Sequence, residues 1–240
     1  MKIFKLLSQK NSNIKDNGNV TAAFLGDSIT HGAFEFVDID GKSGHHIYDY
    51  DAVYHAQLKR MFFELFPVAP LNTVNAGIAG TSTSFGLKRI ERDVLRYSPD
   101  LVVVCFGLND AFSGIEGIEV YADALRNIFM KLKDANIEMI FMTPNMMNTY
   151  ISPKVTNEEM LKVATDTEKI QNSGLFDKYI DAARKVCREE NVPICDCYEK
   201  WKTMHSEGVD TTELLANHIN HPNREMHKLF AQSLYDMIIE

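Results

Sequence analysis

The strongest constraint on this chain is a regular alternation of short apolar runs with longer amphipathic stretches. The run Leu101–Cys105 is apolar at every position, which is typical of a strand that is covered on both faces. Between such runs, apolar residues recur at spacings of three and four, as they do on one face of a helix. This alternation predicts an α/β fold in which helices cover both faces of an open parallel sheet. We expect five strands, at Val20–Leu25, Leu71–Asn75, Leu101–Cys105, Glu138–Met142 and Pro193–Asp196.

The helices and the domain organisation follow from the same patterns. Residues 1–19 are largely polar and end in a turn-like composition, so we expect an N-terminal arm or a short edge element there. No linker divides residues 20–240, which predicts a single domain, and a chain of this length can bury a full core without disulfides. Apolar stripes at helical spacing lie within Tyr54–Leu65, Leu87–Val94, Tyr121–Leu132, Phe176–Cys187 and Met226–Ile238.

Two segments, His31–Asp51 and Thr143–Asn172, do not fit the alternation. Long connections in compact domains are often functional, so both segments are candidate walls of a pocket. Surface elaboration without a function is an equally good interpretation.

Net charge and cysteine usage exclude several classes of protein. The chain carries 25 basic and 33 acidic side chains, a net charge of −8. Binding to nucleic acids or anionic membranes relies on clustered Lys and Arg, so we expect neither. No apolar run approaches the ~18 residues of a membrane span, and the apolar N-terminal stretch is too short for a signal peptide, which favours a cytoplasmic location. Repeated CxxC pairs are absent from the sequence, so we expect reduced core thiols at Cys105, Cys187, Cys195 and Cys197.

Glycine and small polar residues follow three of the expected strands. They form the segments Gly26–Thr30, Asn75–Gly80 and Gly107–Asp110. The ligand crevice of an open parallel sheet lies beyond the carboxyl ends of its strands, and glycine lets backbone approach a ligand closely. We therefore expect a functional site at this edge. A phosphate site is disfavoured, because Gly77-x-x-Gly80 is too short for a dinucleotide fingerprint and no GK[ST] follows a strand.

A histidine near the C-terminus is a candidate base for this site. His221 precedes Pro222, which suits the first position of the last expected helix. The residue before a proline is restricted to extended backbone, so the side chain of His221 should be well fixed. A serine hydroxyl needs such a base to act as a nucleophile near neutral pH, and Ser28 follows the first strand.

Together these blocks resemble the GDSL, or SGNH, hydrolase family. They occur in order as Gly26-Asp27-Ser28, Asn75-x-Gly77-x-x-Gly80, Gly107-x-Asn109-Asp110 and His221-Pro222-Asn223. The resemblance spans residues 20–240. It implies a flavodoxin-like, three-layer α/β/α sandwich with a parallel five-stranded sheet, and a serine esterase that needs no cofactor.

The resemblance also implies roles for individual residues. Ser28 would be the nucleophile and His221 the general base. The backbone N–H groups of Ser28 and Gly80 would form the oxyanion hole with the side-chain amide of Asn109. Such donors must be aimed in advance at the charge of the tetrahedral intermediate. We expect structural roles in the turns for Asp27, Asn75, Gly77 and Asp110.

The chain departs from the family pattern at one position. The family places an aspartate three residues before the histidine, where this chain has His218. The proton on Nδ1 of His221 could be accepted by a backbone carbonyl, by the side chain of Asn217 or His218, or by a distant acid, or the enzyme could be weak or inactive. We favour a Ser–His dyad with a neutral acceptor, whose turnover rises as the imidazole loses its proton near pH ~6.5. The distant acids considered are Glu213, Asp210 and Asp196.

A metal site is not expected. His218-x-x-His221 lies in a loop without a third ligand nearby, and His45-His46 could join it only through an unpredictable contact.

The substrate is indicated only by the segment His31–Asp51. Aromatic rings can stack on sugars and carboxylates can bind their hydroxyls, so we prefer a small-molecule or glycan ester, an acetylated carbohydrate above all. Packing of these aromatics onto the body is an equally good interpretation. An acyltransferase on the same site and a non-catalytic binding module are the alternatives, and the oligomeric state is not indicated. The residues concerned are Phe34, Phe36, Asp38, Asp40, Tyr48 and Tyr50.

Overall fold

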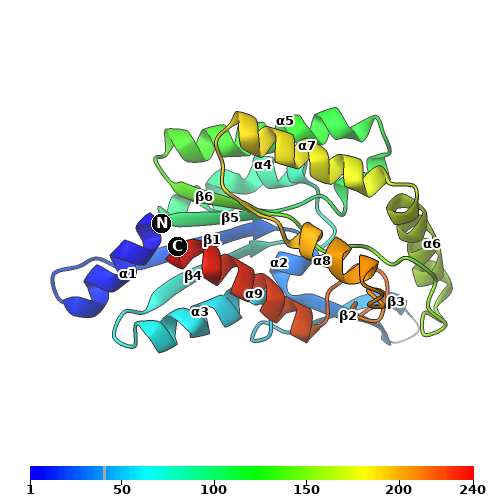
Figure 1. Ribbon diagram of the computed structural model, residues 1–240, viewed down its shortest axis with the longest axis horizontal. Coiled ribbons are helices and arrows are strands. Elements are labelled where there is room, and N and C mark those ends of the chain that lie inside the picture. The colour runs from blue at the N-terminus through cyan, green and yellow to red at the C-terminus, as the bar shows by residue number, and fades with distance from the viewer. Residues whose placement is uncertain (40–41) are drawn as a thin grey trace.

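A five-stranded parallel sheet forms the centre of the computed structural model, which describes residues 1–39 and 42–240 (Figure 1). The strand order is β4-β1-β5-β6-β7, which is the flavodoxin-like order 2-1-3-4-5 counted along this sheet. The expected α/β fold and all five expected strands are confirmed, with bounds that differ by a few residues. The strands are β1 (Val20–Gly26), β4 (Leu71–Gly77), β5 (Leu101–Cys105), β6 (Glu138–Met142) and β7 (Ile194–Cys195).

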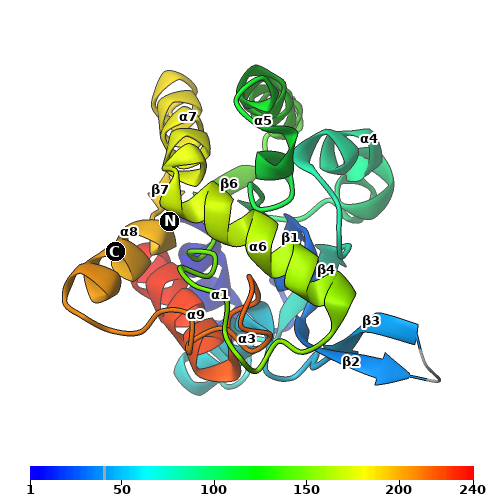
Figure 2. The ribbon, with the colours of Figure 1, turned by 90° about the vertical axis from the view of Figure 1, so that its right-hand side faces the viewer.

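Helices cover both faces of the sheet and make the expected three layers (Figures 1 and 2). One layer holds α4 (Thr83–Asp93), α5 (Gly117–Asp134) and α7 (Leu175–Glu189). The other holds α1 (Lys2–Ser12), α3 (Tyr54–Leu65) and α9 (Arg224–Ile239), with α8 (Cys197–Ser206) packed beside α9. The short 3-10 helices are η1 (Leu95–Tyr97) and η2 (Asp110–Ser113).

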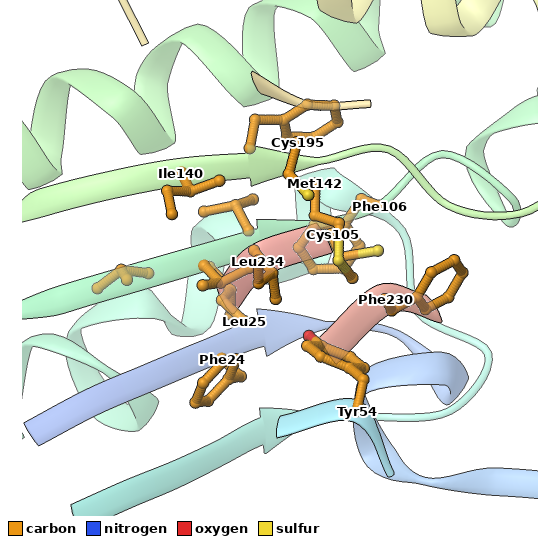
Figure 3. Packing of buried hydrophobic residues seen from close by; sticks show 14 of the residues in the cluster. Phe24, Leu25, Tyr54, Cys105, Phe106, Ile140, Met142, Cys195, Phe230 and Leu234 are labelled. Carbon is orange, nitrogen blue, oxygen red and sulfur yellow. The ribbon is translucent and has the colours of Figure 1, made fainter. Parts of the chain in front are cut away.

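One hydrophobic core runs through the three layers. Every residue of β5 is buried, because helices lie on both of its faces. Side chains of the strands and of α9, including Phe24, Cys105 and Leu234, belong to the same cluster (Figure 3). The four cysteines are buried and free.

The first residues differ from the arm or edge element that the sequence suggested. They form α1, which buries Ile3 and Leu7 in the core. The carboxylate of Glu138 accepts hydrogen bonds from the N–H groups of Lys2 and Ile3 and so caps this helix. The apolar residues of this helix end at Leu7, and Lys10 completes its buried face, so the apolar pattern is too short to mark a helix. The single domain expected over residues 20–240 stays a prediction.

The two segments that break the alternation lie at the carboxyl end of the sheet (Figure 2). The first contains α2 (Ser28–His31) and an antiparallel hairpin of β2 (Ala33–Ile39) and β3 (Lys42–Tyr48). The second contains a buried extended stretch and α6 (Glu158–Asn172), which crosses this end of the sheet. Asp40 lies outside the described residues. Within the described chain, no helix is long and apolar enough to cross a membrane.

Candidate active site

The turn from β1 to α2 presents Ser28 at the carboxyl end of the sheet. The side chain of Asp27 caps α2 by accepting a hydrogen bond from the N–H of Ile29 at 3.0 Å. Ser28 is the first residue of α2, so its N–H has no partner within the helix. A Cβ on Gly77 would lie 2.2 Å from the backbone nitrogen of His31, so only glycine lets β4 approach α2 this closely.

The loop before α9 brings the imidazole of His221 to Ser28. The Nε2 atom of His221 lies 3.0 Å from Oγ of Ser28, and both residues are buried. Oδ1 of Asn217 accepts hydrogen bonds from the N–H groups of Ile219, Asn220 and His221 at 2.9–3.0 Å. Asn217 therefore shapes the loop that carries the histidine and does not contact its ring.

A backbone carbonyl takes the place of the missing aspartate. Nδ1 of His221 lies 3.0 Å from the carbonyl oxygen of Phe34 on β2. A carbonyl can only accept, so Nδ1 carries the proton and the lone pair of Nε2 faces the hydroxyl of Ser28. This is the first of the arrangements that the sequence left open, a neutral acceptor.

The other candidate acceptors have different partners. Nδ1 of His218 lies 3.9 Å from Oε1 of Glu213. Asp196 accepts from Nε of Arg184 at 2.8 Å, and Asp210 accepts from N–H groups of its own turn. Among the residues described, the imidazole of His221 forms its hydrogen bonds with Phe34 and Ser28, so the alternative in which the side chain of Asn217 or His218 accepts from it is not the arrangement found.

Gly80 and Asn109 lie at the same pocket as Ser28 and His221. Gly80 has φ = +71°, a conformation that favours glycine. Nδ2 of Asn109 donates to the carbonyl of Thr81 at 3.1 Å and lies 3.4 Å from Oδ2 of Asp27, which fixes the amide. The pocket has a volume of about 270 Å³, and its further walls are Phe36, His46, Ala79, Phe112, Met160, Val163 and Asn220.

Burial controls the ionisation of the site. Removal from water lowers the pKa of His221 to about 3, against a smaller opposing effect of its bond to Phe34. The expected value near 6.5 applies to an unperturbed imidazole, and burial perturbs this one. Burial also raises the pKa of Asp27 to about 7 and that of Asp110 to about 6.

The remaining motif residues hold the turns together, as expected. Nδ2 of Asn75 donates to the carbonyl of His31 at 3.1 Å, and its Oδ1 accepts from the N–H of Gly77 at 3.0 Å. Asp110 accepts from the N–H and the hydroxyl of Thr83 at 3.0 and 2.9 Å.

One supporting residue was missed. The guanidinium of Arg89 is buried and donates to the carbonyls of Ala76 at 2.6 Å and Gly26 at 2.8 Å. The Arg89 guanidinium thus joins the ends of β4 and β1 next to the turn that carries Ser28. Arg89 and Asp93 are four residues apart, a spacing typical of an ordinary surface ion pair on a helix, so nothing in the sequence marks Arg89 as a supporting residue.

In the described part of the chain, no three potential metal ligands gather into a site.

Comparisons with known proteins identify the family to which the chain belongs. The chain matches the GDSL-like lipase/acylhydrolase family over residues 24–229. No curated protein matches its sequence.

Several solved structures share the fold at low sequence identity. Axe2, an acetylxylan esterase from Geobacillus stearothermophilus, is 20% identical with a TM-score of 0.66, over 92% of this chain and 95% of that one. CEX, a two-domain esterase active on acetylated mannans, is 20% identical with a TM-score of 0.65, over 99% of this chain and 52% of its own. LAE5, an α/β hydrolase from the metagenome of Lake Arreo, is 21% identical with a TM-score of 0.65, over 90% and 94%. With the family match covering most of its length, the chain belongs to the GDSL-like lipase/acylhydrolase family and is a carboxylic ester hydrolase.

Proposed function

We propose that the chain hydrolyses short acyl esters, acetyl esters of carbohydrates above all, through an acyl-enzyme on Ser28 with His221 as the base. The observation that carries the proposal is the 3.0 Å contact between Oγ of Ser28 and Nε2 of His221, with Nδ1 of the same ring bonded to the carbonyl of Phe34. This geometry supports the tautomer in which Nε2 of His221 can accept the proton of the Ser28 hydroxyl.

The first half-reaction transfers the acyl group to the enzyme. Oγ of Ser28 attacks the ester carbonyl carbon while Nε2 of His221 takes the hydroxyl proton. The N–H groups of Ser28 and Gly80 and the amide of Asn109 stabilise the oxyanion. His221 then gives its proton to the departing alcohol as the carbon–oxygen bond breaks.

The second half-reaction releases the acid. His221 takes a proton from water, whose oxygen attacks the acyl carbon, and the proton returns to Oγ of Ser28 as the enzyme–acyl bond breaks. The carbonyl of Phe34 holds the ring throughout by accepting from Nδ1–H. Because this carbonyl carries no negative charge, it does not stabilise the imidazolium as a carboxylate would, which is consistent with the low pKa of His221 in the free enzyme.

Two observations support a short acyl group on a carbohydrate. The catalytic pocket has a volume of about 270 Å³ and is lined by Phe36, Phe112, Met160 and Val163, a size that suits a short acyl group. The structural neighbours Axe2 and CEX are described as acting on acetylated xylan and acetylated mannans.

Hydrolysis of p-nitrophenyl acetate tests the mechanism. Ser28→Ala and His221→Ala should each lower kcat by roughly 10⁴-fold or more, as removal of a nucleophile or its base does in other serine hydrolases. A fluorophosphonate should label the unaltered protein and not Ser28→Ala. Retained turnover or labelling in Ser28→Ala would contradict the proposal.

A further inference from the structure

A row of aromatic rings leads outward from the catalytic base along strand β3. His46 and Tyr48 are two residues apart and so share one face of the strand, and Tyr50 follows them. The ring centroids of His221 and His46 are 5.4 Å apart, those of His46 and Tyr48 are 5.7 Å apart, and those of Tyr48 and Tyr50 are 5.9 Å apart. His31 flanks the row, with its centroid 4.5 Å from that of Tyr48.

Exposure increases along this row. His46 is half-buried and forms part of the wall of the catalytic pocket. Tyr48 is 37% exposed and Tyr50 is 58% exposed. Phe34 on the same hairpin is fully buried and packs the hairpin onto the body of the protein, so that packing does not need Tyr48 and Tyr50. The outer rings of the row are therefore available to a ligand.

The catalytic pocket and the row form one continuous surface, because His46 belongs to both. A pocket of about 270 Å³ that also holds the reacting atoms has no room for a large alcohol. That alcohol receives its proton from Nε2 of His221, and the ring of His46 is the next ring outward on β3. The alcohol portion of a large ester would thus leave the pocket along the row.

The aromatic faces and hydrogen-bonding groups of the row determine which kind of alcohol portion it can bind. The faces of Tyr48 and Tyr50 offer stacking surface, while their hydroxyls, the ring nitrogens of His46 and Nε2 of His31 offer hydrogen bonds; Nδ1 of His31 already accepts from the N–H of Ala79. An alkyl chain would cover these polar groups without pairing them, which is costly. A sugar ring has an apolar C–H face and hydroxyls around its edge, so it matches both properties.

We propose that His46, Tyr48 and Tyr50 form a subsite that binds the sugar chain of an O-acylated oligosaccharide during deacylation of that chain. This inference rests on the proposed function and adds the residues that recognise the alcohol.

The base of the hairpin that carries the subsite is tied to the start of α9, next to the loop of His221. Nε of Arg224, at the start of α9, pairs with Asp49 at 2.8 Å, and its Nη1 pairs with Glu35 at 2.5 Å. The same guanidinium lies 4.4 Å from the ring centroid of Phe34. These contacts connect the strands of the subsite to the segment that carries the base.

The test compares two substrates in the variants Tyr48→Ala, Tyr50→Ala and the double variant. The substrates are p-nitrophenyl acetate, which has a small leaving group, and acetylated xylo-oligosaccharides of increasing length. We expect the double variant to lose about 10-fold or more in kcat/KM for the oligosaccharides relative to p-nitrophenyl acetate, and to lose any preference for longer chains. Tyr97→Ala is the matched control, since Tyr97 is 51% exposed and lies outside the catalytic pocket.

A binding measurement separates recognition from chemistry. In the Ser28→Ala background, titration calorimetry with unacetylated xylo-oligosaccharides should detect binding that the Tyr48 and Tyr50 substitutions weaken by a similar factor.

Any of the following outcomes would overturn the proposed subsite. Equal losses on both substrates would show that the tyrosines only support the fold. No loss on either would show that the row binds nothing, and a selective loss on p-nitrophenyl esters of long fatty acids would assign it to the acyl chain. Failure of the proposed function would instead appear as unchanged p-nitrophenyl acetate hydrolysis in Ser28→Ala.

Discussion

Acidification should leave the catalytic base active far below the pH at which an ordinary histidine is protonated. Burial lowers the pKa of His221 to about 3, and the neutral ring is the form that accepts a proton from Ser28. With a pKa of 6.5 only about 3% of the rings would be neutral at pH 5, whereas with a pKa of about 3 about 99% would be. The two cases thus differ roughly 30-fold in kcat/KM at pH 5.

The assay is kcat/KM for p-nitrophenyl acetate between pH 4.5 and 8, which reports groups of the free enzyme. Fluorescence of Trp201, which is fully buried, checks at each pH that the protein stays folded. Asp27 needs its own control, because its pKa of about 7 could produce a limb in the same range. Asp27→Asn removes that group and keeps an equally good helix cap. Asp110, with a pKa of about 6, needs the same control, and Asp110→Asn supplies it. A limb near pH 6.5 that persists in both Asp27→Asn and Asp110→Asn would refute the reasoning.

Three substitutions test the remaining parts of the site. His218→Ala and His218→Asp should both keep kcat within about twofold, because the carbonyl of Phe34 already accepts the Nδ1 proton, and a large change in either variant by the p-nitrophenyl acetate assay would reassign the acceptor. Asn109→Ala should lower kcat by about 10²–10³-fold and change KM little, as loss of an oxyanion donor does, and a pure KM effect would contradict that role. Arg224→Met should lower kcat about 5-fold, because partly exposed ion pairs worth about 0.2–1 kcal/mol each hold the strand of Phe34. The control is Arg126→Met, which breaks surface ion pairs on α5, and equal losses in both would remove any link to the site.

The pairing of Ser28 with His221 across 193 positions was predicted from the resemblance of the motif blocks to the GDSL family, while the carboxyl ends of the parallel strands predicted where Ser28 lies. Residue type carried that signal, since serine, histidine, glycine and asparagine each do something that few other residues do. Residue type does not indicate the group that accepts from Nδ1 of His221. Because every residue has a backbone carbonyl, only the folded hairpin shows that the acceptor is the carbonyl of Phe34.

Helices α1 and α6 were not predicted from the sequence, for a related reason. α1 buries Ile3, Leu7 and Lys10, and the buried residues of α6 are Ala164, Thr167 and Gln171. The buried face of each helix thus includes polar side chains, which interrupt the apolar stripe on which periodicity depends. The side chain of Gln171, for example, accepts from the N–H of Met147 and donates to the hydroxyl of Tyr198.

A carbonyl acceptor has consequences that a carboxylate would not have. A carboxylate would favour the imidazolium by charge and raise the pKa of the base, whereas the carbonyl of Phe34 fixes the tautomer and leaves burial to dominate. The orientation of the base then depends on the position of a strand rather than on one side chain. Because the same hairpin carries Phe34 on β2 and the row of His46 and Tyr48 on β3, a sugar chain bound to that row would steady the strand pair that orients His221. Binding energy from the alcohol portion would in that way appear in kcat as well as in KM.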